Sequence, residues 1–243
     1  MTNYLLITGA SSGIGQQCAI QLSQEYNLVL TGRSVEKLGH TLSLCNNKQR
    51  HIILELDLSD IPEISHKLSD CIVKNNIIID RFLHCAGDIY TTQIKLFDYH
   101  IIKQIFDINL FSSMEIIKLL LKKSPNQKGL VNIIFISALY SKKAVKGNSF
   151  YASSKAALDS YMRCLAKELA PQVRANSILP GGIRTPMSES VFSDEQNLKK
   201  ILADYPLGFG KKEDVANTVE FLFSDKSKWI TGQQISVDGG ASI

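Results

Sequence analysis

The sequence predicts an α/β fold in which helices cover both faces of a parallel sheet of about seven strands. Short apolar runs alternate with segments of helical periodicity from one end of the chain to the other, which is the pattern of a doubly wound sheet. A length of 243 residues with 44% hydrophobic residues suits one domain with a sizeable core. We therefore expect a single domain over residues 1–243.

A glycine-rich turn stands between the first expected strand and the first expected helix. The strand covers Tyr4–Ile7, the turn Thr8–Gly15 and the helix Gln16–Tyr26. Glycines let the backbone approach a ligand closely, and the free N–H groups of a helix N-terminus attract an anion. Because strand, turn and helix follow in the required order, we prefer a pyrophosphate site to a purely structural turn. The expected contacts are Gly9, Ser11, Ser12, Gly13, Ile14 and Gly15.

The remaining strands and helices follow in alternation. Further strands are expected at Asn27–Leu30, Ile52–Leu56, Ile77–Leu83, Leu130–Ile136 and Arg174–Leu179, with a last one inside Ile230–Gly240. Helices are expected at Ser34–Leu44, from Pro62 to about Asn75, at Asp98–Leu121, at Tyr151–Leu169 and from Glu213 onward. Residues 130–136 are nearly all apolar, which is typical of a central strand buried on both faces.

Three motifs link the chain to a known family. Thr8-Gly9-x-x-x-Gly13-Ile14-Gly15 resembles the cofactor signature of the short-chain dehydrogenase/reductase family, and Tyr151-x-x-x-Lys155 resembles its catalytic pair. The segment Ile230–Gly240 is similar to the closing strand of the single-domain branch that includes the 3-oxoacyl-carrier-protein reductases. The resemblance covers nearly the whole chain and implies a Rossmann-type NAD(P)-binding domain. It also implies a homodimer or homotetramer packed through long helices.

Arg33 bears on the choice between NAD(H) and NADP(H). It follows the second expected strand, where an NAD site usually carries an Asp or Glu about 20 residues beyond the glycine turn. No acid stands at that place, and a guanidinium suits a 2′-phosphate but gains little from a neutral hydroxyl. We therefore expect NADP(H) to be preferred over NAD(H), with a solvated surface arginine as the alternative.

The family resemblance implies further cofactor contacts after later strands. Asp57, followed by Leu58, would hydrogen-bond the adenine, with a helix-capping role for Asp57 as the alternative. Ala86 and Gly87 would allow the backbone to approach the cofactor and form a wall of its site. The segment that would hold the nicotinamide carboxamide contributes Pro180, Gly181, Ile183 and Thr185.

His84 and Cys85 depart from the family pattern, because they replace both asparagines of its Asn-Asn-Ala-Gly motif. A histidine beside a cysteine could suggest a metal or redox site. No partner ligands stand at a useful spacing, however, so we interpret the pair as packing residues and expect no metal.

Tyr151 and Lys155 are the expected catalytic pair. They are four positions apart, so both side chains project from one face of a helix. A free phenol has a pKa near ~10, and a neighbouring ammonium should lower it. The resemblance makes Tyr151 the proton donor or acceptor and Lys155 its partner, which also binds the cofactor. It makes Asn109 the holder of a water in the proton relay, although an Asn in an apolar helix can also simply mark a bend.

The catalytic serine of the family is displaced. Counted back from Tyr151, its position falls on Ala138, and Ser137 stands one residue early. Neighbouring strand residues point to opposite faces, so Ser137 could act as the catalytic hydroxyl only through a local bulge or slip. Tyr140 and Ser141 are the other possible donors. Loss of one such hydrogen bond costs about 10²–10³-fold in rate, which slows an enzyme without abolishing it.

Two segments are expected to border the substrate. Residues 188–209 mix apolar and polar side chains and are expected to form a lid over it. Lys142, Lys143 and Lys146 precede Tyr151 in a segment that borders the substrate mouth in the family. Three cations there would attract an anionic or carrier-bound substrate. A solvated loop is the equally weighted alternative.

Composition argues against several functional classes. Lys and Arg number 27 against 23 Asp and Glu, a scattered excess of four that does not indicate a nucleic-acid partner. No apolar run is long enough to cross a bilayer, and the first strand begins too early to leave room for a signal peptide. Five cysteines, an odd number without a C-x-x-C pair, indicate reduced thiols. We expect a cytoplasmic protein without a membrane or nucleic-acid partner.

These observations together predict an NADP(H)-dependent oxidoreductase that interconverts a small-molecule carbonyl and a secondary alcohol. The alternative from another class is a catalytically weak or inactive NADP-binding regulator or scaffold, which Ala138 and His84-Cys85 motivate. A nucleotide-sugar epimerase or dehydratase is a weaker alternative, because those enzymes need a larger C-terminal substrate region than remains here.

Overall fold

The computed structural model describes residues 1–193 and 195–243 and contains one seven-stranded parallel sheet. The strands are β1 (Thr2–Thr8), β2 (Leu28–Gly32), β3 (His51–Glu55), β4 (Ile77–His84), β5 (Asn132–Ile136), β6 (Arg174–Pro180) and β7 (Gln234–Val237). Their order across the sheet is β3-β2-β1-β4-β5-β6-β7. The predicted doubly wound parallel sheet is therefore confirmed.

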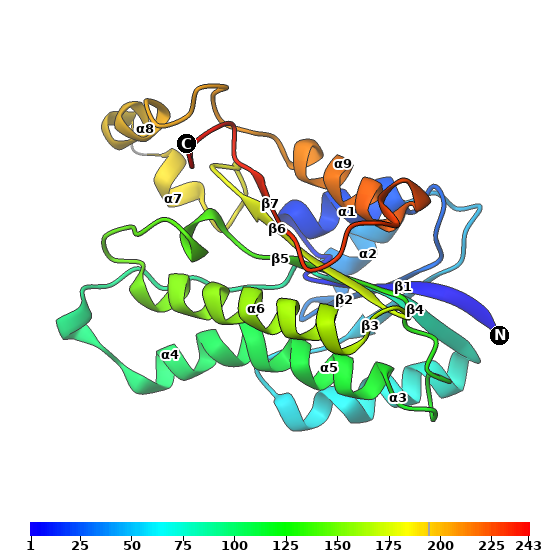
Figure 1. Cartoon of the computed structure of the whole chain (residues 1–243). Coiled ribbons are helices and arrows are strands. Elements are labelled where there is room, and N and C mark those ends of the chain that lie inside the picture. The colour runs from blue at the N-terminus through cyan, green and yellow to red at the C-terminus, as the bar shows by residue number, and fades with distance from the viewer. Residues whose placement is uncertain (194) are drawn as a thin grey trace.

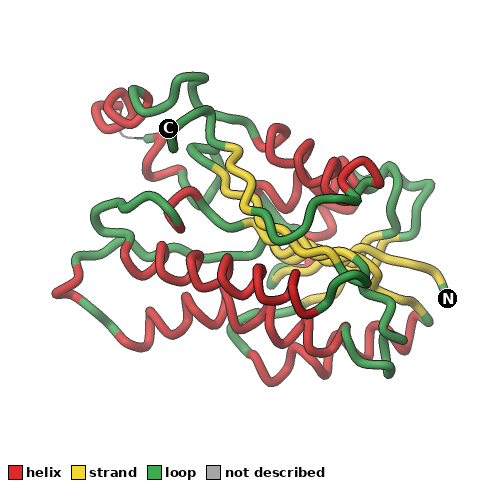
Figure 2. Tube along the Cα trace, viewed as in Figure 1, coloured by secondary structure: helices red, strands yellow, loops and turns green. Residues whose placement is uncertain are grey.

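Helices cover both faces of the sheet (Figures 1 and 2). One face carries α1 (Gly13–Leu22), α2 (Val35–Leu44) and α9 (Lys212–Phe223), and the other carries α3 (Ile61–Asn75), α4 (Tyr99–Phe106), α5 (Ser112–Leu120) and α6 (Ser149–Glu168). Alternate strand residues feed the two resulting cores: Leu5 and Ile7 pack on the α1 side, and Leu6 packs on the α6 side. This alternation is the consequence of the period-2 geometry of a strand that is buried on both faces.

The expected single helix over 98–121 is instead three consecutive helical segments. A π-helix, η2 (Asp107–Phe111), separates α4 from α5. The hydroxyl of Ser112 donates to the carbonyl of Ile108 at 2.7 Å, and that of Ser113 donates to Leu110 at 2.7 Å. Both hydroxyls thus bond to main-chain carbonyls of this wider turn.

The strand order creates a crevice at one edge of the sheet. β1 pairs with both β2 and β4, so the chain runs outward in opposite directions on either side of it. Ligands of open α/β sheets bind at this switch point, beyond the carboxyl ends of the strands. The short helices α7 (Glu189–Phe192) and α8 (Glu195–Leu202) lie near this end, close to the C-terminus (Figure 1). Single 3-10 turns complete the structure: η1 (Ile94–Leu96), η3 (Leu139–Ser141) and η4 (Asp225–Ser227).

Among residues 1–193 and 195–243, no helix combines the length and the hydropathy that a bilayer crossing requires.

Candidate active site

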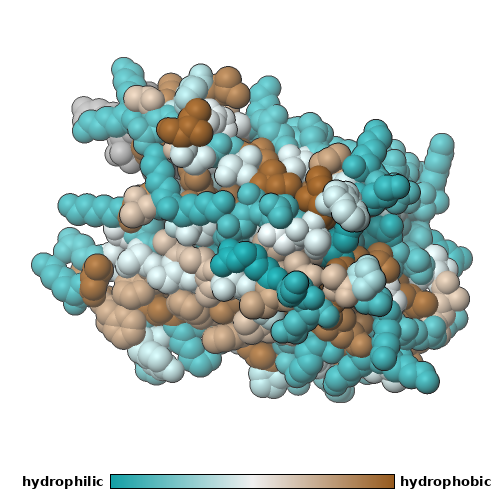
Figure 3. All heavy atoms as spheres, viewed as in Figure 1, coloured by the Kyte–Doolittle hydropathy of each residue, from teal (hydrophilic) through white to brown (hydrophobic). Residues whose placement is uncertain are grey.

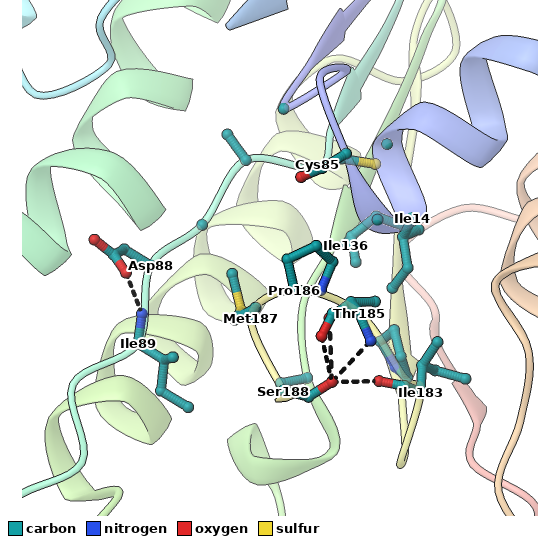
Figure 4. A pocket seen from close by; sticks show the side chains of 18 of the residues that line it. Ile14, Cys85, Asp88, Ile89, Ile136, Ile183, Thr185, Pro186, Met187 and Ser188 are labelled. Atoms are coloured by element: carbon teal, nitrogen blue, oxygen red, sulfur yellow. Dashed lines mark hydrogen bonds between the residues drawn. The ribbon is translucent and has the colours of Figure 1, made fainter. Parts of the chain in front are cut away.

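A cavity of about 420 Å³ opens at the carboxyl ends of the strands. All the predicted cofactor-binding residues line it, together with Tyr151, Lys155 and Ser137, whereas Asn109 lies outside its wall. Figure 4 shows Ile14 and Cys85 on one side and the segment from Ile183 to Ser188 on the other. Segments more than 170 positions apart in the sequence thus meet at one site.

The glycine turn leaves no room for side chains. A Cβ atom at Gly9, whose φ is +69°, would lie 2.8 Å from the main-chain nitrogen of Ala86. A Cβ atom at Gly15 would lie 2.3 Å from the carbonyl oxygen of Gly9. Only glycine therefore lets the turn pack against the end of β4 and lead directly into α1. The N-terminus of α1 consequently faces the cavity.

Hydroxyl and N–H groups at this turn suit a phosphate. Ser12 is the N-cap of α1 and its side chain makes no capping bond. Within the described part of the chain, the hydroxyls of Ser11 and Ser12 have no hydrogen-bond partner, although both residues line the cavity. Free donors at a helix N-terminus form an anion site, so the local geometry fits a pyrophosphate.

Arg33 and Asp57 lie together at the far end of the cavity, after β2 and β3. Arg33 is exposed, and the carboxylate of Asp57 accepts hydrogen bonds from the main chain and the hydroxyl of Ser59 at 2.9 and 2.8 Å. Burial raises the pKa of Asp57, but the bonds from Ser59 and the charge of Arg33 outweigh it and hold that pKa below its ordinary value. Asp57 does not cap α3, since the N-cap of that helix is Asp60.

The opposite wall is a short loop that Ser188 holds together (Figure 4). Its hydroxyl donates to the carbonyl of Ile183 at 2.7 Å and accepts the N–H of Thr185 at 3.0 Å. A Cβ atom at Gly13 would lie 3.5 Å from the Thr185 methyl group, so this loop packs on the glycine turn. Ser188 was not among the predicted site residues. A serine three positions after a threonine, in the loop after β6, is the signal of such a turn.

Tyr151 and Lys155 lie on the first two turns of α6 and are almost fully buried. The Lys155 ammonium donates to the Ile136 carbonyl at 3.0 Å and lies 5.9 Å from the centroid of the Tyr151 ring. Burial lowers the pKa of Lys155 to about 8, although the buried carboxylate of Asp159, one turn along the helix, opposes the shift. A Cβ atom at Gly87 would lie 3.2 Å from the Lys155 nitrogen, so glycine at this position leaves room for the ammonium.

The predicted lowering of the Tyr151 pKa by Lys155 is wrong for this structure. Burial is the main cause that raises the pKa of Tyr151 above its ordinary value, and the nearby Tyr140 raises it further. The ammonium of Lys155 is turned toward the Ile136 carbonyl, and the phenolate would be poorly solvated. The phenol of Tyr151 is therefore protonated at neutral pH.

Asn109 lies inside the π-helix η2 and is fully buried. Its carbonyl oxygen accepts the N–H of Asp88 at 2.7 Å, and its amide nitrogen donates to the Asp88 carbonyl at 3.0 Å and to Ser154 at 2.9 Å. The side chain thus ties the cavity wall after β4 to α6. Sequence reasoning missed Asp88 and Ser154, which carry no motif of their own.

His84 and Cys85 behave as packing residues. His84 is fully buried, and its ring lies 5.9 Å from that of Phe82 and 6.2 Å from that of Phe135, centroid to centroid. Over the described ranges, no group of three His, Cys, Asp or Glu side chains is placed to hold a metal ion.

One end of the cavity is aromatic. The rings of Phe192 and Tyr205 lie 5.0 and 5.1 Å from that of Phe209, and all three line the cavity. They belong to the predicted lid over 188–209, of which residue 194 lies outside the described residues.

The three lysines before Tyr151 are not part of the cavity wall. Lys143 instead pairs with Asp204 at 3.0 Å and donates to the Ala241 carbonyl at 3.1 Å. This pair links the segment that carries Tyr140 to the segment after α8. An attraction of these lysines for an anionic substrate stays a prediction.

Comparisons with known proteins point to oxidoreductases. Residues 9–242 match the profile of a family described as enoyl-(acyl carrier protein) reductase. The 3-oxoacyl-(acyl-carrier-protein) reductase FabG of Thermotoga maritima is 32% identical over 98% of this chain and 97% of its own length. Carbonyl reductase family member 4 of Xenopus laevis is 32% identical over 100% of this chain and 99% of its own length.

Solved structures give the same result. Actinorhodin polyketide ketoreductase with NADPH has a TM-score of 0.90 at 26% identity, covering 99% of this chain and 97% of the other. 4-Hydroxyisoleucine dehydrogenase complexed with NADH also has a TM-score of 0.90, at 25% identity, covering 100% of this chain and 99% of the other. The similar structures thus include complexes with both nicotinamide cofactors.

Proposed function

Because this chain belongs to the short-chain dehydrogenase/reductase family, we propose that it is an NADP(H)-dependent oxidoreductase that interconverts a carbonyl and a secondary alcohol. The observation that carries the proposal is the meeting of the glycine turn, Arg33 and the Tyr151–Lys155 pair in one cavity. Most of its similar proteins are named as reductases or dehydrogenases of carbonyl and hydroxyl compounds.

The residues present fit a dinucleotide. The N-terminus of α1, with the hydroxyls of Ser11 and Ser12 that have no partner within the described residues, would hold the pyrophosphate. Asp57 and Leu58 would lie against the adenine, and the exposed guanidinium of Arg33 would pair with a 2′-phosphate. The loop around Ile183 and Thr185 would hold the nicotinamide carboxamide, as the family resemblance implies.

Each catalytic side chain would then have one task. The bound nicotinamide would supply the hydride, or accept it in the reverse direction. Tyr151 would donate the proton to the substrate oxygen, and its raised pKa keeps it in the protonated form that carbonyl reduction needs. Lys155, with a pKa of about 8, would carry a charge at pH 7 and hold the ribose hydroxyls. A water relay through Asn109 stays a prediction.

The first experiment is a fluorescence titration of the protein with NADPH and with NADH. We expect tighter binding of NADPH, and Arg33→Ala should weaken it by about 10–100-fold, since a charge-assisted hydrogen bond contributes about 1.5–3 kcal/mol. NADH binding should change little. Arg50→Ala, at another exposed arginine, is the matched control. A preference for NADH, or equal losses for both cofactors, would contradict the role of Arg33.

The second experiment measures NADPH oxidation against a panel of ketones, acyl-thioesters and acidic sugars. Tyr151→Phe should reduce kcat by at least about 10²-fold, because the proton donor is lost. Tyr161→Phe lies on the same helix and outside the cavity, and should retain activity. NADPH binding without turnover of any carbonyl would favour the regulator or scaffold, for which the methyl group of Ala138 in the cavity wall is the specific observation.

We further propose that the protein works in the cytoplasm as a homodimer or homotetramer. All five cysteines are free, which is typical of a reducing compartment. The proposed partners are small carbonyl or alcohol compounds, possible carrier-bound ones included, as the names of similar proteins suggest.

A further inference from the structure

A methyl group stands where the family places the hydroxyl that binds the substrate oxygen. Ala138 follows the end of β5 in an extended conformation, with φ −159° and ψ 152°, and lines the cavity. Without a replacement, negative charge that develops on the substrate oxygen would meet only Tyr151. A second donor at this wall would therefore have a large effect on rate.

Neither neighbouring serine supplies that donor. Ser137 keeps its place in the sheet, since its N–H donates to the Ile178 carbonyl at 2.8 Å. Its hydroxyl is directed back at the carbonyl of Lys155, 3.4 Å away in α6. The hydroxyl of Ser141 is buried and does not reach the cavity. The register of β5 and β6 is unbroken up to Ile136, and the Ser137 N–H continues the ladder, so no bulge brings Ser137 forward.

Tyr140 is placed differently, because the 3-10 turn η3 carries it toward α6. Its ring meets that of Tyr151 edge to face, with centroids 6.3 Å apart and planes at 88°, and it lines the cavity. Within the described residues its hydroxyl has no hydrogen-bond partner. Burial raises the pKa of Tyr140 although Lys143 opposes the shift, so the phenol is a neutral donor at pH 7.

The third tyrosine of the cavity is not equivalent. Tyr205 packs on the main chain of the segment after β6, where a Cβ atom at Gly182 would lie 3.2 Å from its Cζ atom. Its hydroxyl end is thus held against the backbone. Of the three tyrosines that line the cavity, Tyr140 is the one that stands directly beside Tyr151.

From this geometry we infer that Tyr140 supplies the second hydrogen bond to the substrate oxygen, taking the place of the hydroxyl absent at residue 138. The inference rests on the proposed carbonyl reduction. The carbonyl carbon would take the hydride that a bound nicotinamide supplies, the C=O double bond would become a C–O single bond, and the oxygen would take its proton from Tyr151. The Tyr140 O–H donates a hydrogen bond to that oxygen and keeps its own proton throughout.

Tyr140→Phe tests this inference, since it removes the hydroxyl and keeps the ring that packs on Tyr151. We expect kcat to fall by about 10²–10³-fold, the usual cost of losing one such donor. KM and NADPH affinity should change far less, because the bond strengthens as charge develops. Ser141→Ala, one residue along the same turn, is the matched control and should keep wild-type kcat.

A rescue variant separates chemistry from packing. Ala138→Ser in the Tyr140→Phe background should recover much of the lost kcat, because it returns a hydroxyl to the same wall.

The outcomes distinguish this inference from the proposed function. Loss of turnover in Tyr151→Phe supports the proposed function whatever Tyr140 does. If Tyr151→Phe is inactive while Tyr140→Phe keeps wild-type kcat, the proposed function stands and the role of Tyr140 is overturned. A Tyr140→Phe protein that loses kcat but gains nothing from Ala138→Ser also overturns it, because the loss would then come from disturbed packing.

Discussion

At the scale of single residues, burial determines the protonation of His84. Its Nδ1 lies 2.9 Å from the Thr8 hydroxyl, which also accepts the N–H of Ala86 at 3.2 Å. The other ring nitrogen, Nε2, has no hydrogen-bond partner within the described residues. Burial, with the charge of Lys155, lowers the pKa of His84 to about 3.

This histidine should make the stability of the protein depend on pH. In the unfolded chain His84 would titrate near ~6.5. Below that pH the unfolded chain therefore binds a proton that the folded chain does not bind. The stabilisation is complete above pH ~6.5 and is lost as the pH falls toward 3. The slope from this one group approaches about 1.4 kcal/mol per pH unit.

We predict that His84→Asn flattens the pH dependence of the unfolding free energy. Urea denaturation at pH 7.5, 6.5 and 5.5 would measure it, in a window above the titration of most carboxylates. His66→Gln is the control, because His66 is exposed on α3 and should leave the slope unchanged. If the unfolding free energy had the same slope against pH in the wild type and in His84→Asn, the folded protein would be able to hold His84 in its charged form.

At the scale of elements, the hydrogen bonds of Asn109 join three parts of the site. Ser154 accepts the Asn109 amide at 2.9 Å and donates to the Tyr151 carbonyl at 2.8 Å. It thereby connects the π-helix η2 to the helix turn that carries Tyr151. Both residues are fully buried, so water cannot replace either bond.

We predict that Ser154→Ala lowers the unfolding free energy by about 1–3 kcal/mol, because one N–H of Asn109 would be buried without a partner. Ser153→Ala offers a matched control one position earlier on α6, where the side chain is exposed. Urea denaturation would compare the two. If both variants lost the same free energy, helix propensity rather than the bond to Asn109 would explain the effect.

The sequence predicted elements well where apolar spacing determines them. Ser34 was expected to open a helix, and it is the N-cap of α2, accepting the N–H of Lys37 at 3.3 Å. The π-helix η2 was missed, because one wider turn inside a long amphipathic segment leaves no periodic signal. The Tyr151 pKa was misjudged for a related reason: the sequence shows that Lys155 is near, but not that its ammonium turns toward Ile136.

At the scale of the whole molecule, the proposed cofactor side of the cavity was predictable and the proposed substrate side was not. Parallel strands bring their carboxyl ends to one edge, so motifs such as Gly9 and Arg33 that follow strands must converge. The substrate side depends on how η3 and the segment around Tyr205 and Phe209 fold back over that edge. Tertiary packing determines how these segments fold, and no local sequence pattern predicts that packing.

Several large apolar side chains remain exposed on the face that carries α4 and α6. Figure 3 shows apolar residues gathered there, in the region where Figure 1 places these helices. Tyr99 is 62% exposed at the start of α4, and Phe111 is 43% exposed at the end of η2. Contiguous exposed apolar surface of this kind marks interfaces between proteins, and the proposed oligomer would bury it.

We therefore predict that the wild-type protein has a mass in solution of two or four times 27.0 kDa. Phe111→Glu should shift it toward the monomer, since a buried, unpaired carboxylate is strongly unfavourable at an apolar interface. Size-exclusion chromatography with light scattering over a concentration series would measure the change. Val35→Glu, at a half-exposed valine on α2 across the sheet, should leave the mass unchanged. A Phe111→Glu protein that kept the wild-type mass would show that any oligomer forms through another face.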